Sequence, residues 1–395
     1  MADTRDVVVL SGVRTPIGDY GGGLQSFTPP DLGALVVAEA IKRSKVDPGK
    51  IGQGVIGNVI HTQAKDMYVS RLSCVNGGMS HDSGALTVNR LCGSGLQAIV
   101  SAAQMIMLGD TEFAVGGGVE SMSNAGYQAP AARWGARMGD SKLIDMMVGA
   151  LTDPFDTVHM GVTAENIAEK WKLQREEQDE FAVESHRRAA AAIAAGHFKD
   201  QILPIEIKSR KGVTVFDTDE HVRGDASVEG MAKLRAAFKK DGTVTPGNAS
   251  GINDGGAAVV LADAAVAEKQ GLQPMARLVS YGIAGVDPAF MGEGPIPAVK
   301  LVMQRSGLKV SDMDVIEANE AFAAQAMAVC RGLDFDTAKT NPNGGAIALG
   351  HPIGATGALV TVKALYELQR IGGRYALVTM CIGGGQGIAA IFERM

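Results

Sequence analysis

The chain has 395 residues and a formal net charge of −6, with 37 Lys and Arg against 43 Asp and Glu; at roughly 150 residues per domain, this length predicts two or three domains, and the acidic balance argues against a nucleic-acid or anionic membrane partner. No apolar run reaches the ~18 residues that a membrane-spanning helix needs, and the first residues show no export signal, so we expect a cytoplasmic protein with no membrane partner. The four cysteines are too few and too scattered for a disulfide framework or a CxxC metal site, so we expect free thiols and no metal.

The first part of the chain alternates short apolar runs with helical patterns, which is typical of an α/β protein whose sheets are covered by helices. The expected elements are a strand at Val7–Leu10, a helix opening at Pro30-Asp31, a strand at Leu86–Val88, a helix over 96–107 and a strand at Phe113–Val115. Cys92 falls in the turn between the second strand and the second helix. The glycines Gly116–Gly118 are expected to end the third strand, because glycine clusters usually make sharp turns.

Residues 121–249 differ from this pattern, with Trp134, Met138, Met146 and Met147, and with charged helices expected near 174–195 and 228–240. From residue 250 the β/α pattern returns, with strands expected at 257–261, 277–281, 314–318 and 374–380. We therefore expect an N-terminal core half over 1–120 that is completed by 250–272, an inserted loop domain over 121–249, and a C-terminal core half over 273–395.

Two parts of the sequence resemble each other weakly. A strand, a turn with cysteine and glycines, and a helix near 86–108 are matched by a helix, a strand and a second cysteine-glycine turn near 357–387. The segment 314–319 likewise resembles 54–58, because each is a short strand that ends in asparagine. A duplication that brings both cysteines to one seam would explain this pattern.

Cys92 and Cys381 are the candidate reactive thiols. Cys92 precedes a helix, where the helix dipole and free N–H groups favour a thiolate; the alternative is a small buried residue in a tight turn. Cys381 follows an apolar strand and precedes Gly383–Gly385. It could serve as a general acid and base beside amides that receive an oxyanion, or the glycines could simply turn the chain beneath a core cysteine.

Other polar residues are weaker candidates. His351 lies between a glycine and a proline just before an expected helix, a setting that favours a functional role. Asn319 could cap a helix, or it could orient a water or a histidine. Among the other histidines only His159 stays open, and Cys74 and Cys330 are assigned to packing. No phosphate-binding GxxxxGK[ST] loop and no dinucleotide fingerprint occurs, which argues against nucleotide hydrolysis and dinucleotide redox chemistry.

Five motifs, in order along the chain, resemble the thiolase family, and most closely its biosynthetic acetyl-CoA acetyltransferases and β-ketothiolases. They are Asn89–Gly95, Asn248–Gly255, Asn319–Phe322, Gly350–Gly354 and Cys381–Gly385. The resemblance implies two similar α/β halves in a layered αβαβα arrangement with an inserted loop domain that binds CoA, assembled as a homotetramer. It also implies reversible Claisen condensation of two acetyl-CoA, or of acetyl-CoA with a short acyl-CoA, through an acyl-cysteine. CoA thioesters are then substrates, and no cofactor is bound permanently.

The resemblance also implies a role for each matching residue. Cys92 matches the nucleophile that takes the acyl group, His351 the base that activates it, and Cys381 the acid/base that removes the α-proton of the second acetyl-CoA. Asn319, through a water, would hold the enolate oxygen together with His351. The amides of Cys92 and Gly383 would hold the tetrahedral oxyanion, because such an intermediate needs positioned donors in a site with little water.

Further residues match the family's CoA and acyl contacts. Ser250 matches the pantetheine contact and Arg223 a residue near the nucleotide end. The acyl and pantetheine pocket is matched by His159, Met160, Met291, Ala321 and Phe322. The basic run 208–211 could meet phosphates, although a solvated face is the favoured interpretation.

Two departures from the family pattern and two other functions stay open. Gly224 could change the rigidity of the CoA loop, and Glu293 could alter acyl-chain preference or lie on the surface. A decarboxylating ketoacyl synthase would carry histidine or asparagine where Cys381 stands. A catalytically silent acyl-CoA-binding protein would not need both thiols.

Overall fold

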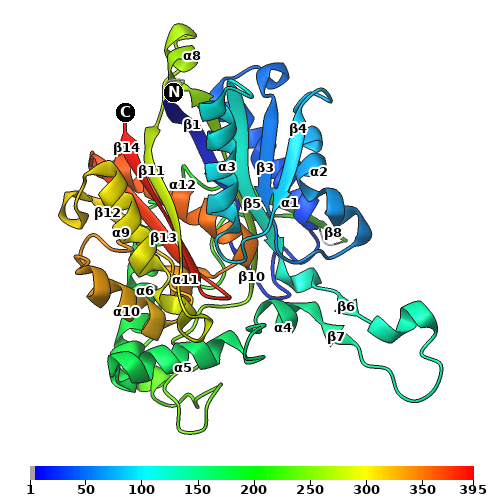
Figure 1. Ribbon diagram of the computed structural model, residues 1–395, viewed down its shortest axis with the longest axis vertical. Helices are drawn as coiled ribbons and strands as arrows, with labels where there is room; N and C mark the ends of the chain where they lie inside the picture. The colour runs from blue at the N-terminus through cyan, green and yellow to red at the C-terminus, as the bar shows by residue number, and fades with distance from the viewer. Residues whose placement is uncertain (1–4, 211) are drawn as a thin grey trace.

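A ten-stranded mixed sheet forms the centre of the computed structural model, which describes residues 5–210 and 212–395 (Figure 1). The strands follow the order β12 (Val315–Ala318), β13 (Tyr375–Ile382), β14 (Gln386–Arg394), β11 (Ala276–Gly285), β1 (Val7–Arg14), β10 (Asn253–Asp263), β5 (Phe113–Ser121), β3 (Gln53–Gly57) and β4 (Gly84–Val88), and β2 (Gly18–Asp19) pairs with β10. The two halves of this sheet meet only where β1 pairs with β11, at Val8 with Arg277 and Val9 with Ala276.

Helices lie in three layers around the two half-sheets. Helices α3 (Ser94–Leu108) and α12 (Ile353–Ile371) pack against each other in the middle, where α3 contacts β3 and β5, and α12 contacts β5, β10, β12 and β13. Helices α1 (Pro29–Ser44) and α2 (Val69–Asn76) cover the first half-sheet, while α9 (Pro295–Ser306) and α10 (Ala323–Leu333) lie with the second. The layered αβαβα fold expected from the sequence is confirmed.

The two halves repeat the same arrangement of parallel strands. In the first half Gln53 of β3 pairs with Ala114 of β5, and in the second Val315 of β12 pairs with Ala376 of β13. The paired residues are 61 positions apart in both halves, from 53 to 114 and from 315 to 376. Helices α3 and α12 lead into β5 and β13, so the duplication places Cys92 and His351 at the starts of equivalent helices.

The expectation that Gly116–Gly118 end a strand is wrong, because β5 continues through them to Ser121. The strand pairs with β10 on one side and β3 on the other, and α3 packs closely on it. A Cβ atom on Gly116 would lie 2.7 Å from the Cα of Ile99, and one on Gly118 would meet the carbonyl oxygen of Gly354. The glycines therefore serve close packing of strand against helices.

The segment between β5 and β10 lies mostly outside the sheet. It contains β6 (Tyr127–Gln128), β7 (Ile144–Asp145), α4 (Met146–Ala150), α5 (Met160–Trp171), α6 (Arg175–Ala194), β8 (Ile205–Ser209), β9 (Gly212–Phe216) and α7 (Val228–Met231). The β6–β7 arm extends away from the body of the molecule (Figure 1), and Trp134 and Met138 on it are 88% and 96% exposed. The remaining short helices are α8 (Ala264–Lys269) and α11 (Ala346–Leu349).

The expected helix over 228–240 is wrong beyond its first turn, since α7 ends at Met231. The chain turns instead, with the Ala237 N–H donating to the Val244 carbonyl at 3.0 Å, and the Phe238 ring stacks on His159 at 4.6 Å. Packing against α5 outweighs local helix propensity here.

Within the described residues, one helical stretch, Leu91–Leu108, has the length and apolar composition to cross a membrane. It includes α3, whose Ala98, Ile99 and Ala102 are fully buried. Its position between the two half-sheets explains the apolar composition, because a helix covered on all sides is apolar on all sides.

Candidate active site

Cys92 lies in the turn between β4 and α3, as expected. The Leu91 backbone adopts φ +43°, and its N–H donates to Asn89 Oδ1 at 3.0 Å. Ser94 Oγ accepts from the Arg90 N–H at 2.8 Å and donates to the Leu91 carbonyl at 2.7 Å. This short network closes the turn and holds Cys92 just before the first turn of α3.

Cys92 opens into a narrow cavity of about 50 Å³ built from both halves and the inserted segment. The predicted residues on its wall are Cys92, Met160, Ser250, Met291, Ala321, Phe322, His351 and Gly383. The wall is completed by four residues that were not predicted from the sequence, Leu91, Ala150, Leu151 and Ile353. These four are apolar residues without a chemical signature, so only the three-dimensional arrangement reveals them.

His351 is held in one orientation and one tautomer. Its Nδ1 lies 2.6 Å from Thr356 Oγ1, and that hydroxyl donates to the Pro352 carbonyl at 3.1 Å. Because the hydroxyl proton is used there, the network assigns the imidazole proton to Nδ1 and leaves a lone pair on Nε2. The backbone N–H of His351 donates to Asn253 Oδ1 at 2.9 Å. Burial lowers the pKa of His351 to about 4, so the ring is a neutral base at neutral pH.

Asn319 lies beside this base and does not cap a helix. Its Nδ2 is 3.5 Å from Nε2 of His351. Helix α10 begins four residues later, at Ala323, with Phe322 in the cap position. The Oδ1 atom of Asn319 is buried and has no hydrogen-bond partner among the described residues, so an acceptor is available to a water. The helix-cap interpretation is therefore wrong.

Cys381, the second candidate thiol, packs with residues that line the Cys92 cavity. Cys381 is fully buried and packs with Met160, Met291 and Phe322. Burial raises the pKa of Cys381 well above the ordinary range, and the electrostatic influence of Cys92 raises it further. Cys381 therefore lies behind the cavity wall, within reach of the charge on Cys92.

At Cys92, burial opposes the thiolate that the helix N-terminus favours. Burial raises the pKa of the Cys92 thiol to about 11, although hydrogen bonds from the N–H groups of Gly383 and of Cys92 itself lower it. Desolvation outweighs these donors and the helix N-terminus. The donors nevertheless converge at the sulfur, where an oxyanion on a bound acyl group would form.

An aromatic cluster from the inserted segment packs against Phe322 of the pocket wall. His159 is the N-cap of α5, with Nδ1 accepting from the Gly161 N–H at 3.0 Å. Its ring stacks on Phe238, and Phe238 meets Phe322 edge-on at 6.2 Å. Ser250 is half-buried, and its N–H donates to the Ala321 carbonyl at 2.9 Å. Sequence reasoning missed Phe238, because it lies in the segment expected to be helical.

Some predicted residues lie away from this pocket. Arg223 is exposed, and its backbone N–H donates to His186 Nδ1 at 3.2 Å. Lys208 and Arg210 of the basic run are exposed, while Lys211 lies outside the described residues. Glu293 binds Lys170 at 2.8 Å and Trp171 Nε1 at 2.7 Å, so its carboxylate is engaged with α5 and does not line the cavity.

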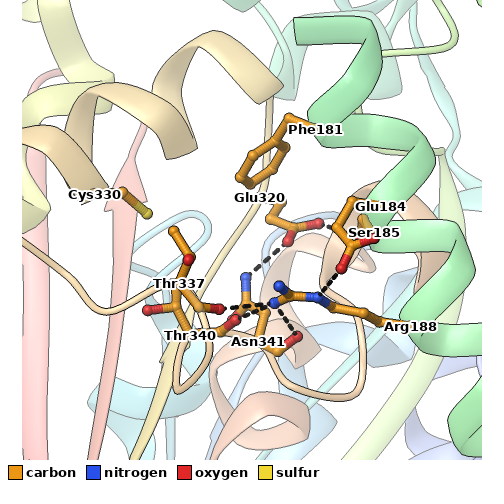
Figure 2. Close-up of a pocket in the computed structure, with 9 residues that line it drawn as sticks. All are labelled: Phe181, Glu184, Ser185, Arg188, Glu320, Cys330, Thr337, Thr340 and Asn341. Carbon is orange, nitrogen blue, oxygen red and sulfur yellow. Dashed lines mark hydrogen bonds and ion pairs between the residues drawn. The ribbon is translucent and has the colours of Figure 1, made fainter. Parts of the chain in front are cut away.

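The two remaining cysteines are not part of the site. Cys74 is fully buried in the first half. Cys330 borders a separate cavity of about 240 Å³ between α6 and residues 337–341, with Phe181 and Arg188 on its wall (Figure 2). Among the residues that the structure describes, no group of three or more His, Cys, Asp or Glu side chains could hold a metal ion.

The chain is similar to known thiolases over almost its whole length. Residues 7–265 match the N-terminal domain of thiolase and residues 272–394 its C-terminal domain. The chain is 66% identical over 393 residues to the beta-ketothiolase BktB of Cupriavidus necator, with 99% of this chain and 100% of that protein covered. It is 47% identical to an acetyl-CoA acetyltransferase of Paracoccus denitrificans, with 98% of this chain and 99% of that protein covered.

Solved structures show the same fold. The crystal structure of the Bacillus anthracis acetyl-CoA acetyltransferase matches with a TM-score of 0.98 at 44% identity, and both chains are covered fully. Human mitochondrial 3-ketoacyl-CoA thiolase in complex with CoA matches with a TM-score of 0.97 at 45% identity, over 100% of this chain and 99% of that one. Since both thiolase domains together match almost the whole chain, this protein belongs to the thiolase family.

Proposed function

We propose that this thiolase condenses two acetyl-CoA, or acetyl-CoA with a short acyl-CoA, to 3-ketoacyl-CoA and free CoA, and catalyses the reverse thiolysis. The observation that carries the proposal is that Cys92 and His351 share the wall of one narrow cavity, while Cys381 packs with the wall residues Met160, Met291 and Phe322. Covalent capture on a sulfur divides the condensation into two easier steps.

The first step transfers an acyl group to Cys92. His351 Nε2 takes the thiol proton while the sulfur attacks the thioester carbonyl, and the N–H groups of Cys92 and Gly383 stabilise the tetrahedral oxyanion. When this intermediate collapses, the bond to the CoA sulfur breaks. The departing CoA sulfur takes the proton of Cys381. The acyl-enzyme is then left with protonated His351 beside the Cys381 thiolate.

The second step forms the carbon–carbon bond. The Cys381 thiolate removes an α-proton from the second acetyl-CoA, and its raised pKa makes it a strong base for this task. The enolate oxygen receives hydrogen bonds from His351 Nε2–H and from a water held by Asn319. The enolate carbon attacks the acyl carbonyl, and Cys92 leaves and recovers its proton from His351. Cys381 ends the cycle as a thiol.

CoA itself would lie along the inserted segment. Ser250, Met160, Met291 and Phe322 line the cavity and would contact the pantetheine arm and the acyl group. His159 stacks on Phe238, which in turn meets Phe322, and would support this wall from behind. The human mitochondrial 3-ketoacyl-CoA thiolase structure that this fold matches is a complex with CoA. Arg223 would meet the nucleotide end, outside the cavity, where it is exposed.

The enzyme would assemble as a homotetramer. The β6–β7 arm carries Trp134, Met138 and Leu143, which are 88%, 96% and 68% exposed, and exposed apolar patches of this kind mark protein interfaces. Light scattering on the full chain, compared with a Trp134→Ser, Met138→Ser variant, tests the assembly: the variant is expected to have a lower mass. The cytoplasmic location of the enzyme stays a prediction.

The decisive experiment follows each half of the reaction separately. Acetyl-CoA is added to the wild type and to Cys92→Ala and Cys381→Ala variants, and acid-quenched protein is analysed by mass spectrometry. We expect acetyl on Cys92 in the wild type and in Cys381→Ala, none in Cys92→Ala, and acetoacetyl-CoA only from the wild type. A wild type that carries no acetyl group, or one that condenses only malonyl donors, would contradict the proposal.

A further inference from the structure

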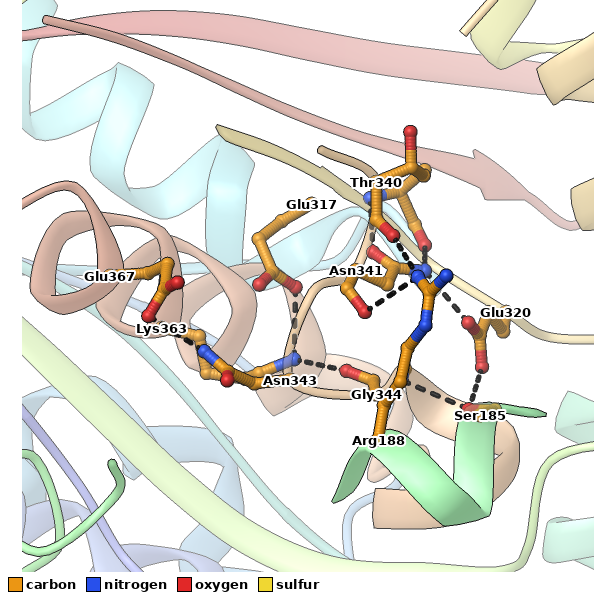
Figure 3. Close-up of polar contacts among 12 residues, drawn as sticks. Ser185, Arg188, Glu317, Glu320, Thr340, Asn341, Asn343, Gly344, Lys363 and Glu367 are labelled. Atoms are coloured by element: carbon orange, nitrogen blue, oxygen red, sulfur yellow. Dashed lines mark hydrogen bonds and ion pairs between the residues drawn. The ribbon is translucent and has the colours of Figure 1, made fainter. Parts of the chain in front are cut away.

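Glu320, the residue after Asn319, has a buried carboxylate that is surrounded by donors. Its Oε1 accepts from Asn341 Nδ2 at 2.8 Å, and its Oε2 accepts from Ser185 Oγ at 2.7 Å (Figure 3). The same Oε2 also accepts from the Ile347 N–H at 3.3 Å. The residue is only 2% exposed. Burial raises the pKa of Glu320, but all three partners donate, so the contacts favour the ionised form.

The first of these contacts fixes the segment that carries Asn319. Asn341, with φ +46°, places its amide against the end of β12. Its Oδ1 accepts from the Ala318 N–H at 2.9 Å, and its Nδ2 donates to the Ala318 carbonyl at 2.8 Å. Asn341 therefore binds both polar groups of Ala318 and also the side chain of Glu320. Asn319 lies between these two anchored residues.

The second carboxylate oxygen of Glu320, Oε2, fixes the segment that leads to His351. Ser185 Oγ, which donates to Glu320, accepts from the Gly345 N–H at 3.0 Å. The Ile347 N–H binds the same carboxylate oxygen, so both anchored amides lie at the start of α11, which ends two residues before His351. A Cβ atom at Gly345 would overlap the Glu320 carboxylate, so this close contact requires glycine.

On one side, the Glu320 carboxylate and its partners are held by hydrogen bonds more than by packing. Glu320, Ser185 and Asn341 border the cavity of about 240 Å³ (Figure 2). Arg188 closes its edge by donating to the carbonyls of Thr337 at 3.0 Å and Thr340 at 2.7 Å. Because empty space adjoins the carboxylate there, loss of a hydrogen bond is not compensated by packed side chains.

We propose that Glu320 is a positioning residue for the condensation step. It joins the segment of Asn319, the segment leading to His351, and helix α6 of the inserted segment at one carboxylate. In this way it sets the 3.5 Å separation between Asn319 Nδ2 and His351 Nε2. The inference rests on the proposed function, in which these two groups hold the enolate oxygen together.

The test compares the two half-reactions in a Glu320→Gln variant. Whichever way the new amide turns, at least one donor among Asn341, Ser185 and Ile347 loses its acceptor. We expect the rate of condensation to fall about tenfold relative to the rate of Cys92 acetylation, because a lost hydrogen bond to a charged group has about this effect. Rapid quenching with labelled acetyl-CoA gives the first rate and acetoacetyl-CoA formation the second.

An isotope effect separates positioning from general damage. With trideuterated acetyl-CoA, the variant is expected to show a larger primary isotope effect than the wild type, because α-proton removal becomes more rate-limiting. Glu184→Gln is the matched control: it neutralises a neighbouring carboxylate on α6 that binds Arg187 and Arg188, and the ratio of the two rates should stay at the wild-type value.

Other outcomes overturn the inference. Equal losses in both half-reactions, an unchanged isotope effect, or the same change in Glu184→Gln would show that Glu320 does not act on the enolate-binding pair. If Glu320→Gln does not fold, Ser185→Ala decides by the same ratio, since it removes one donor to the carboxylate and the acceptor of Gly345. Failure of the proposed function is distinct, because the wild type itself would then form neither acetyl-enzyme nor acetoacetyl-CoA.

Discussion

Replacing Thr356 by valine is expected to slow catalysis with little change in shape. Valine has nearly the same volume, but it removes the oxygen that lies 2.6 Å from His351 Nδ1. Thr356 is 2% exposed and His351 6%, so water does not readily replace the lost acceptor. The Nδ1–H group is left buried without a partner, and the tautomer that keeps a lone pair on Nε2 loses its support.

The magnitude follows from the cost of that unpaired donor. A buried donor without an acceptor costs about 1–3 kcal/mol, and about 1.4 kcal/mol corresponds to a tenfold change in rate. We therefore expect kcat for thiolysis of acetoacetyl-CoA to fall about 5- to 140-fold. The assay is the initial rate of acetoacetyl-CoA consumption at saturating CoA, measured beside the urea unfolding curve of each variant.

Thr361→Val on the same helix is the matched control. Thr361 is fully buried, and its hydroxyl donates to the Gly357 carbonyl at 2.7 Å without touching His351. We expect a similar change in the free energy of unfolding and a kcat within about twofold of wild type. A Thr356→Val enzyme with wild-type kcat, or an equal loss of kcat in Thr361→Val, would refute the argued role of the hydroxyl.

Three further predictions concern ionisation and stability. Because the pKa of Cys92 is raised to about 11, its alkylation by iodoacetamide should keep rising about tenfold per pH unit through pH ~9, and a plateau below pH ~8 would contradict this. Because the pKa of His351 is lowered to about 4, single-turnover acylation should show no loss between pH ~7 and ~5, and an inflection near pH ~6.5 would contradict it. Asp219→Asn breaks a fully buried ion pair with Arg14 at 2.7 Å and should lower the free energy of unfolding by about 3–5 kcal/mol. In the same urea titration, Lys239→Gln at an exposed pair should cost less than about 1 kcal/mol.

Local sequence signals predicted the parts of the site that depend on neighbouring residues. A strand pattern, glycines and a helical pattern meet around Cys92, and the structure has the turn there. The setting of His351 before a helix is equally local. Thr356 could have been found by the same reasoning, because a hydroxyl five residues after a histidine, within the first turn of that helix, is a natural partner for the ring.

Contacts between distant segments could not be predicted in this way. Ser185 is 135 positions from Glu320, and no pattern in either segment indicates the other. At Gly116 the local signal was misleading. Its glycine cluster indicates a turn, but the close approach of Ile99 requires glycine inside a strand. The resemblance to thiolases indicated the right family, but it assigned no partner to the carboxylate of Glu320.

The ionisation states explain why the cavity has to be narrow. With the pKa of Cys92 raised to about 11 and that of His351 lowered to about 4, the resting pair is a neutral thiol and a neutral base. A helix N-terminus alone does not stabilise a thiolate there, because the free-energy cost of burying the charge exceeds the stabilisation from the nearby N–H groups. Charge must therefore develop only when a thioester carbonyl arrives to receive it. The same desolvation strengthens the attraction between protonated His351 and an enolate oxygen, so a site that disfavours the free ions favours the bound, paired ones. A mutation that admits water beside Cys92 should accordingly make the thiol easier to ionise and at the same time a poorer catalyst.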